Sequence, residues 1–341
     1  MQLINLFNPF NYFKSNLTEI ADNINFQEKT GGIRNNTVYN GIIISLYGFF
    51  ERFIDELASK YLEFLLFCSA REDAFESIEK AKQQIENMYK ANLCDFLINP
   101  KRHSNIDSSY ENVNQILSSY INIRINRDYS HINKDLLLIH GGNIRSDVLF
   151  TFFKNLQVQN MQFSICDCGP FKDFLMSELG FDEVVIGQLK SQTNSDLYLQ
   201  LNRLVDERNI VAHTGKSENK ISFNEILNKT IPFLLVFADA ISRSLIEFVY
   251  KNLIVDTKFR FTNESIFKAF DNCILCHENE SFIIEKGDYF VIQTKDDFFI
   301  TKILTIQLNN KDILNTSILN QIYGFKVDRR IKSEDKVICV I

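Results

Sequence analysis

The chain has 341 residues, of which 45% are hydrophobic and 23% are charged, and its formal net charge is −6. These values are ordinary for a globular protein, exclude a disordered chain and leave room for two hydrophobic cores. Proteins that coat nucleic acid without sequence preference are usually basic, so any contact with RNA is expected to be local. With 12 Gly and 4 Pro but 31 Phe, the composition favours long helices packed through large rings.

The sequence also gives expectations about the compartment. The seven cysteines are scattered, and the N-terminus lacks the basic region and cleavage site of a signal peptide, so we expect a reducing cytoplasm and no disulfides. The most apolar stretch, residues 41–70, is interrupted by Glu51, Arg52, Asp55 and Glu56, which would be costly in a bilayer. No membrane-spanning segment is therefore predicted.

A helical pattern begins near the N-terminus. Apolar residues recur at spacings of three and four over residues 35–68, which predicts one long helix. Further helices are expected over residues 72–97 and 110–125, and a polar turn that contains Pro100 separates them.

The same pattern continues in the middle of the chain. Two more helices are predicted over residues 145–158 and 194–212, the first of them after a pair of glycines. Ser222 and Glu225 fit a capping box, in which each side chain bonds the other's free backbone amide, so a last long helix is expected to begin there. Pro232 predicts a kink in that helix.

The character of the sequence changes after about residue 260. Short β-branched and aromatic runs alternate with turn-forming residues, which predicts strands at residues 282–284, 289–293, 298–308 and 337–341. We therefore predict an α+β protein of two domains: a mostly helical one over residues 1–257, with an N-terminal extension, and a small β-barrel over residues 258–341.

The residues that could carry chemistry lie near the end of the helix expected over residues 194–212. Arg208 falls on the apolar stripe of that helix, where a charge needs an explanation. The stripe consists of Leu201, Leu204, Val205, Val211 and Ala212. One explanation is an arginine that extends from a helix end to solvent. The other is a phosphodiester site formed with Asn209 and His213, because Arg can bind a phosphate through two hydrogen bonds, His can transfer a proton and Asn can orient one of them.

The segment from Arg208 to His213 resembles the R-x4-6-H signature of the HEPN superfamily, including the polar residue that follows the arginine. Residues 42–65 look like the first long helix of the RiboL-PSP-HEPN branch, and the segment from Gly142 to Leu149 is similar to the same branch. The resemblance covers about residues 30–253 and agrees with the mostly helical pattern.

This resemblance implies a metal-independent endoribonuclease, often a toxin or anti-phage effector that cleaves tRNA or other RNA. The implied reaction is attack of a ribose 2′-OH on its own 3′-phosphate, which leaves a 2′,3′-cyclic phosphate and a 5′-OH. His213 would move the proton and Arg208 would stabilise the charge on the phosphorane oxygens. HEPN proteins commonly join two such motifs across a homodimer, and the apolar stripe around Arg208 fits such a face. An antitoxin or regulatory protein is a further implied partner.

An alternative is a non-catalytic HEPN module that binds RNA or nucleotide, or a scaffold in a larger complex. Within the enzymatic interpretation, Glu51 is a further catalytic candidate, since a polar residue of an early helix often approaches the HEPN motif. The other interpretation of Glu51 is a solvated helix face. Arg124, Arg127 and Lys134 form a basic cluster suited to RNA phosphates, or else a solvated loop.

Two further signals lie in the C-terminal region. Cys273, Cys276 and His277 look like half of a zinc knuckle, but structural zinc needs four ligands, so we expect cysteines that fill apolar gaps and no metal or cofactor. The predicted strands resemble the β-barrel second domain of translational GTPases, which implies a module for binding tRNA, the ribosome or a trigger protein. The alternative is a generic barrel.

Overall fold

A computed structural model describes most of the chain, namely residues 8–30, 36–69, 76–100, 106–129, 132–138, 143–215, 221–249, 266–277, 283–287, 289–293, 298–317, 321–332 and 335–340. The chain forms two compact units, one of which contains residues 8–70 and 81–247, while the other includes residues 248–341. The domain boundary expected at 257/258 lies outside the described residues.

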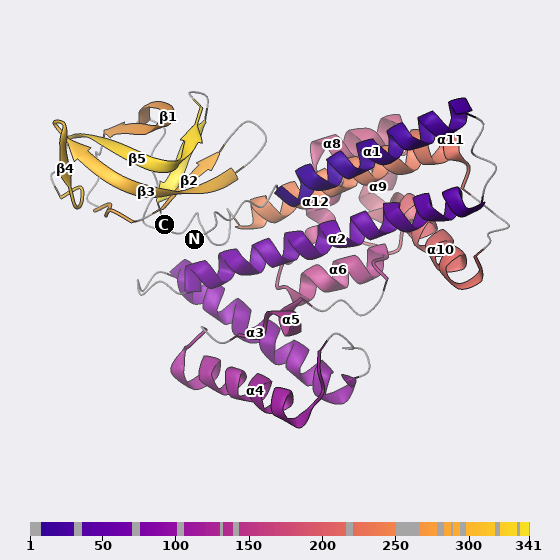
Figure 1. Cartoon of the computed structure of the whole chain (residues 1–341), viewed down its shortest axis with the longest axis horizontal. Coiled ribbons are helices and arrows are strands. Elements are labelled where there is room, and N and C mark those ends of the chain that lie inside the picture. The colour runs from indigo at the N-terminus through magenta and orange to yellow at the C-terminus, as the bar shows by residue number, and fades with distance from the viewer. Residues whose placement is uncertain are drawn as a thin grey trace. The chain divides into compact units, whose positions relative to one another are not determined.

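The first unit is helical (Figure 1). Its longer helices are α1 (Asn8–Thr30), α2 (Asn36–Ser69), α3 (Glu76–Ile98), α4 (Tyr110–Ile121), α6 (Ser146–Asn155), α10 (Leu199–Thr214) and α12 (Ile231–Val249). Shorter segments are the π-helix η3 (Asn122–Asn126), α5 (Lys134–Leu137), α7 (Met161–Asp167), α8 (Gly169–Ser177), α9 (Glu183–Leu189), the 3-10 turn η4 (Asp196–Tyr198), α11 (Phe223–Glu225) and the π-helix η5 (Ile226–Thr230). In the described part of the chain, no helix combines the length with the apolar character that a membrane crossing requires.

The predicted helices are confirmed where the structure describes them. The helix expected over residues 35–68 is α2, and its apolar side, from Tyr39 to Leu65, is buried as the spacing predicts. The N-terminal extension contains a helix that was not predicted from the sequence, α1, which packs against α2. Phe13 of α1 stacks on Phe53 of α2, with 5.1 Å between their ring centroids.

The helix expected after Ser222 is confirmed but is not regular. The Ser222 hydroxyl accepts the Glu225 N–H at 3.1 Å, as an N-cap should. The Glu225 side chain, however, forms an ion pair with Arg203 of α10. The π-helical segment η5 immediately precedes Pro232, which has no N–H to donate into a helix. A π turn thus lies directly before this proline, and the kink itself stays a prediction.

Aromatic rings of α12 form the centre of the helical core. The ring of Phe237 lies within 5.3 to 6.2 Å, centroid to centroid, of the rings of Phe50, Phe171, Tyr198 and Phe233. Phe237 is fully buried. Rings from α2, α8, η4 and α12 thus meet at one residue, which fixes these elements relative to each other.

The C-terminal unit contains an antiparallel sheet with the strand order β1-β5-β3-β2-β6, and β4 pairs with β3. The strands are β1 (Ile266–His277), β2 (Tyr289–Gln293), β3 (Phe298–Leu308), β4 (Lys311–Ile313), β5 (Ile322–Ile331) and β6 (Lys336–Val340). One face packs a core around Phe290, Tyr323 and Phe325. A mostly helical region followed by a small β region is therefore confirmed, while closure of the sheet into a barrel stays a prediction.

The strand predictions were correct only in part. The strands expected at 289–293 and 298–308 coincide with β2 and β3. The strand expected at 282–284 is wrong for the described residues Ile283 and Ile284, which precede an isolated bridge between Glu285 and Asn315. Instead of pairing with a neighbouring strand, the Ile284 N–H donates to the side-chain hydroxyl of Thr316 at 2.8 Å. The strands β1, β4 and β5 lie outside the predicted ranges.

We predict that Phe237→Ala destabilises the helical unit by about 3–5 kcal/mol, because it removes a fully buried ring and leaves a cavity between four aromatic neighbours. Urea unfolding followed by circular dichroism measures this loss. Phe26→Ala is the matched control, since Phe26 is 63% exposed and its removal leaves the core intact. Equal effects of the two substitutions would contradict this description of the core.

A second prediction concerns alkaline pH. The Sγ of Cys166 and the hydroxyl of Tyr198 are 3.1 Å apart and buried. Burial raises the pKa of Cys166 to about 11 and also raises the pKa of Tyr198 above its ordinary value. Both groups are therefore neutral in the folded state over a wider pH range than in the unfolded state. The contribution of Cys166 to the free energy of unfolding is complete below the ordinary thiol pKa of about 9 and is lost as pH rises toward 11.

The free energy of unfolding should therefore fall by on the order of 2 kcal/mol over this range through Cys166 alone. Urea titrations at a series of pH values give the slope. The Cys166→Ala variant should show a flatter slope, and an unchanged slope would refute the assignment.

Candidate functional site

The two sides of α10 have different partners. Leu201, Leu204, Val205 and Val211 are at most 3% exposed, because this side packs into the helical unit that contains α2. From the sequence, the apolar stripe around Arg208 was interpreted as a face for a second copy of the chain. The structure corrects this interpretation, since four of the five stripe residues are already buried within the same chain and only Ala212 is exposed.

Arg208 is held in place by three neighbours. Its Nη1 donates to the Oδ1 of Asn143 and to the Oδ1 of Asn209, each at 3.2 Å. Its guanidinium carbon lies 4.9 Å from the ring centroid of Tyr47 on α2, within the range of a cation–π contact. Asn143 also donates from Nδ2 to the Oδ1 of Asn209 at 2.7 Å. The half-buried guanidinium is therefore fixed by two amides and one ring from three separate segments.

The remaining donors of Arg208 are available. A guanidinium carries five N–H groups, and both hydrogen bonds to the asparagines come from Nη1. Among the described residues, the Nε and Nη2 groups of Arg208 have no acceptor. These two nitrogens form the edge that binds a phosphate or carboxylate through two parallel hydrogen bonds. The contacts with Asn143 and Asn209 thus orient the guanidinium and leave one edge for an anion.

Glu51 is connected to Arg208 through Tyr47. The Tyr47 hydroxyl donates to Glu51 Oε1 at 3.1 Å and accepts the Ile144 N–H at 2.9 Å. Burial raises the pKa of Tyr47, so the hydroxyl stays protonated and can donate to the carboxylate. Glu51 itself is half-buried. The structure therefore places Glu51 behind the ring on which Arg208 rests, and no contact joins Glu51 to Arg208 directly among the described residues.

The segment that carries Asn143 is fastened to α10 along one side of that helix. The Asn202 Oδ1 accepts the Ser146 N–H at 3.1 Å, which satisfies a free amide at the start of α6. Arg145 forms an ion pair with Asp206, one turn further along α10. Asn202, Asp206 and Asn209 stand at positions i, i+4 and i+7, so they share one side of a helix that turns once every 3.6 residues or so. The start of α6 therefore runs along the polar side of α10 (Figure 1).

His213 occupies the last turn of α10 and is exposed. It continues the same side of the helix at i+11 from Asn202. Gly215 ends the helix with a positive φ of 69°, and its N–H donates to the Val211 carbonyl at 2.9 Å. Asn40 of α2 donates to the Gly215 carbonyl at 2.8 Å, which fixes this end of α10 beside α2. Within the described part of the chain, the imidazole makes no hydrogen bond, so it is open to solvent or to a ligand.

A buried carboxylate precedes Arg208. The Tyr39 hydroxyl donates to Glu207 Oε1 at 2.6 Å, and it also accepts the Ile221 N–H at 3.0 Å. Burial, followed by the hydrogen bond to Glu207, raises the pKa of Tyr39. Glu207 is 4% exposed, so this carboxylate anchors α10 to α2 and does not face solvent.

The basic cluster predicted from the sequence lies apart from these residues. Arg124 belongs to η3 and forms an ion pair with Glu86 of α3, so its charge is partly satisfied. Arg127 caps η3 with a positive φ of 54°, and Lys134 is exposed at the start of α5. The cluster thus belongs to the region of α3, η3 and α5 and not to α10. Its role in RNA binding stays a prediction.

The cysteines of the predicted half-knuckle belong to a strand. Cys273 and Cys276 lie on β1, where they pair in register with Lys326 and Tyr323 of β5. Over the described residues, no group of three or more His, Cys, Asp or Glu side chains could hold a metal ion.

Sequence reasoning missed Asn143, Tyr47 and Asn40. Asn143 falls in a segment that resembles the HEPN branch, but only the fold shows that its amide meets Arg208 across 65 positions of the chain. Tyr47 stands four residues before Glu51 on one helix face, and that spacing could have indicated their hydrogen bond.

Comparison with known proteins places the chain in a family. The family model RiboL-PSP-HEPN matches residues 11–247. No curated protein and no solved structure matches the chain. The matched region contains α2, α6 and α10, and with them every residue placed around Arg208. A HEPN domain indicates a nuclease or an RNA-binding module. Because the match covers more than half of the 341 residues, the chain belongs to the RiboL-PSP-HEPN family.

Proposed function

We propose that this protein is a metal-independent HEPN endoribonuclease that cleaves RNA to 2′,3′-cyclic phosphate and 5′-OH ends. The observation that carries the proposal is the guanidinium of Arg208, which is fixed through Nη1 and the Tyr47 ring while its Nε and Nη2 edge has no acceptor among the described residues. A guanidinium held in this way is ready to bind a phosphate without first being ordered.

In this proposal, the residues around Arg208 have separate roles. Arg208 binds the scissile phosphate and stabilises the charge that grows on its oxygens in the transition state. Asn209 and Asn143 position the guanidinium, since their oxygens are already committed to it. Tyr47 supports the ring-facing side, and Glu51 holds the Tyr47 hydroxyl. Both asparagines and Glu51 thus act through Arg208.

His213 moves the proton. It is exposed on the last turn of the same helix, five residues after Arg208, where its imidazole can reach a bound RNA strand. One imidazole cannot readily serve as the base for the 2′-OH and as the acid for the leaving 5′-oxygen in the same step. We therefore include in the proposal a homodimer in which a second copy contributes the second histidine.

The cellular part of the proposal is a toxin or anti-phage role in the cytoplasm, with tRNA as one candidate substrate and an antitoxin or regulatory protein as a partner. Arg124, Arg127 and Lys134 are proposed as contacts to RNA away from the cleaved phosphate. Residues beyond 247 lie outside the family match, and for them a role in recognising the ribosome, tRNA or a trigger protein is part of the proposal.

A second candidate function is a non-catalytic module that binds RNA or nucleotide, or a scaffold. The exposure of His213 fits this function as well, because a side chain that faces solvent need not take part in a reaction. The two functions differ in whether the RNA chain is broken.

We predict that His213→Ala lowers cleavage by at least about 10²-fold while the fold is unchanged, because general acid–base catalysis contributes about 10²–10⁴ in rate. The assay uses purified protein and total RNA with a chelator of divalent metals, and it identifies the product ends. His213 is exposed, so circular dichroism of the variant should match wild type. Wild-type cleavage by the variant would exclude the catalytic role, and wild-type RNA binding without any cleavage would favour the second function.

Arg208→Lys should also abolish cleavage. Lysine keeps the charge but cannot present two parallel N–H groups, so it loses the two-point contact with phosphate. The control is Arg52→Lys, because Arg52 is exposed on α2, pairs with Glu56 and lies over the Tyr12 ring at 4.8 Å, and among the described residues it contacts neither Asn143 nor Asn209. An Arg208→Lys variant as active as Arg52→Lys would refute the two-point contact.

A further inference from the structure

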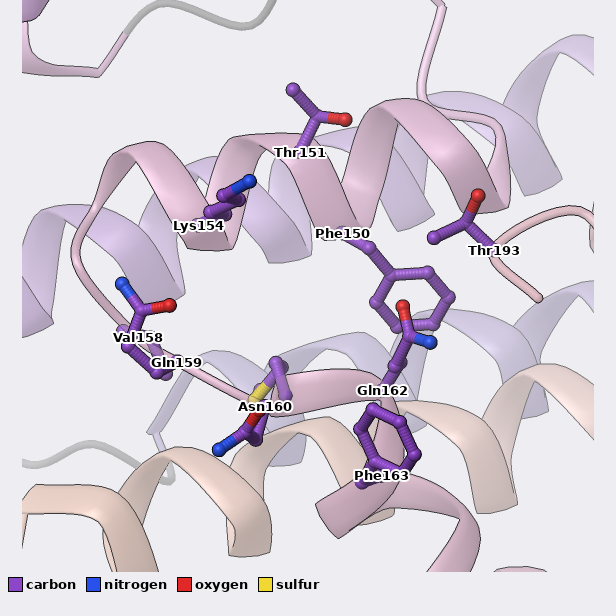
Figure 2. Close-up of a pocket in the computed structure, with 10 residues that line it drawn as sticks. Phe150, Thr151, Lys154, Val158, Gln159, Asn160, Gln162, Phe163 and Thr193 are labelled. Carbon is purple, nitrogen blue, oxygen red and sulfur yellow. The ribbon is translucent and has the colours of Figure 1, made fainter. Parts of the chain in front are cut away.

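A pocket of about 380 Å³ lies along the C-terminal half of α6 (Figure 2). Its walls come from α6, from the turn after it, from α7 and from the segment before η4. The lining includes Phe150, Lys154, Gln162, Phe163 and Thr193. Its volume is within the range of small-ligand sites. None of these residues belongs to the contacts around Arg208.

The polar lining consists mainly of neutral groups that both donate and accept. Gln159, Asn160 and Gln162 contribute amides, and Thr151 and Thr193 contribute hydroxyls. Gln162 is fixed, since its Nε2 donates to the Lys190 carbonyl at 2.9 Å. Its Oε1 remains an acceptor, and Figure 2 shows the Gln162 amide beside the Phe150 ring. Amides that offer donor and acceptor together match the edges of a nucleobase.

Two aromatic rings stand at the same end of the pocket as Gln162 (Figure 2). Phe150 is 6% exposed and forms part of the wall, where its ring meets Tyr198 at 5.0 Å. Phe163 is 37% exposed, so part of its ring is open to a ligand. Lys190 Nζ lies 5.9 Å from the centroid of the Phe163 ring. An exposed ring beside the fixed amide of Gln162 is a surface on which a base can stack.

The charges at the pocket are unequal. Lys190 is paired with Asp167 at 2.9 Å. Lys154, by contrast, is exposed and has no carboxylate partner among the described residues. Two aromatic rings, neutral amides and one unpaired cation are what a nucleotide requires: a stacking surface, an edge to read and a countercharge for its phosphate.

The pocket is rigidly connected to the site at Arg208. The start of α6 is fastened to α10, and Lys154 stands eight residues after Ser146, about 12 Å along the helix. On the other side, Thr193 precedes Asn194, whose Oδ1 accepts from the Asn202 amide at 2.8 Å. Asn202 in turn caps α6. A strand whose phosphate lies at Arg208 can therefore reach the pocket within a few nucleotides.

We propose that this pocket takes an unpaired nucleobase of the RNA substrate, a few nucleotides from the cleaved phosphate, with the base stacked on Phe163, its edge read by Gln162 and its phosphate bound by Lys154. This inference rests on the proposed function, because it assumes a single RNA strand that passes Arg208. In this proposal, the pocket selects an unpaired base, and the position of that base determines which phosphate of the RNA lies at Arg208.

The test measures binding of a short unstructured RNA oligonucleotide by fluorescence anisotropy, in the His213→Ala background, which prevents cleavage. Phe163→Ala should weaken binding roughly 5- to 150-fold, the loss of one stacked base. Phe26→Ala, another exposed phenylalanine, should leave binding unchanged. Lys154→Gln should weaken binding and reduce its salt dependence, whereas Lys229→Gln, an exposed lysine on η5, should not.

Oligonucleotides that lack one base at a time locate the contact. At one position, loss of the base should weaken binding to the His213→Ala chain but not weaken binding further when Phe163→Ala is also present. In the Gln162→Ala variant, loss of the base at that position should likewise cause no further weakening of binding, although both aromatic rings are kept. RNA binding with no coupled position overturns the pocket and leaves the proposed function in place. Absence of both RNA binding and cleavage overturns both, and equally tight binding of a free nucleoside monophosphate in the pocket marks a small-molecule site and overturns the RNA assignment.

Discussion

The immobilisation of Arg208 is the constraint on which the site depends. A guanidinium that is half-buried loses part of its hydration, and this loss must be offset by acceptors and by a polarisable surface. Asn143 and Asn209 supply the acceptors, and the Tyr47 ring supplies the surface. Because both acceptors bind the same nitrogen, the compensation uses one corner of the guanidinium and leaves the opposite edge for an anion. A carboxylate partner in place of the asparagines would have neutralised the charge that a phosphate needs.

The fold provides this arrangement through the two-sided character of α10. Its apolar residues are buried in the helical core, whereas Asn202, Asp206 and Asn209 bind the start of α6 on the other side. Each of these residues binds a different group of the segment that leads into α6. Asn202 accepts a backbone N–H, Asp206 pairs with an arginine, and Asn209 accepts from an asparagine. His213 is the next residue on that side, and it lies beyond the described start of α6. Among the described residues, the segment before α6 contacts the polar side of α10 only at its earlier turns, and His213 on the last turn is exposed.

Local patterns were sufficient for the elements and for the motif, but not for the contacts that make a site. The spacing of apolar residues predicts α2, and Ser222 marks the start of α11, because these signals lie within a few residues of each other. The meeting of Asn143 with Arg208 depends on how α6 docks, which no local pattern encodes. The strand β1 was missed because its pairing with β5 depends on the rest of the sheet, and no local pattern around Cys273 and Cys276 encodes that pairing. The apolar stripe of α10 was correctly identified but assigned to the wrong partner, since burial inside a chain and burial between chains leave the same pattern in the sequence.

The burial of the apolar stripe of α10 also limits where a second copy of the chain could bind. The buried side of α10 is already in use, so a partner that supplied a second histidine would have to contact the exposed surface of the helix. Ile210 is 42% exposed and stands three residues before His213, which makes the two side chains neighbours on the helix surface. A partner that covered Ile210 would gain apolar contact and would at the same time remove water from around His213. Exclusion of water strengthens the attraction between a fixed guanidinium and a phosphate, so association and the electrostatics of catalysis would be favoured by the same contact.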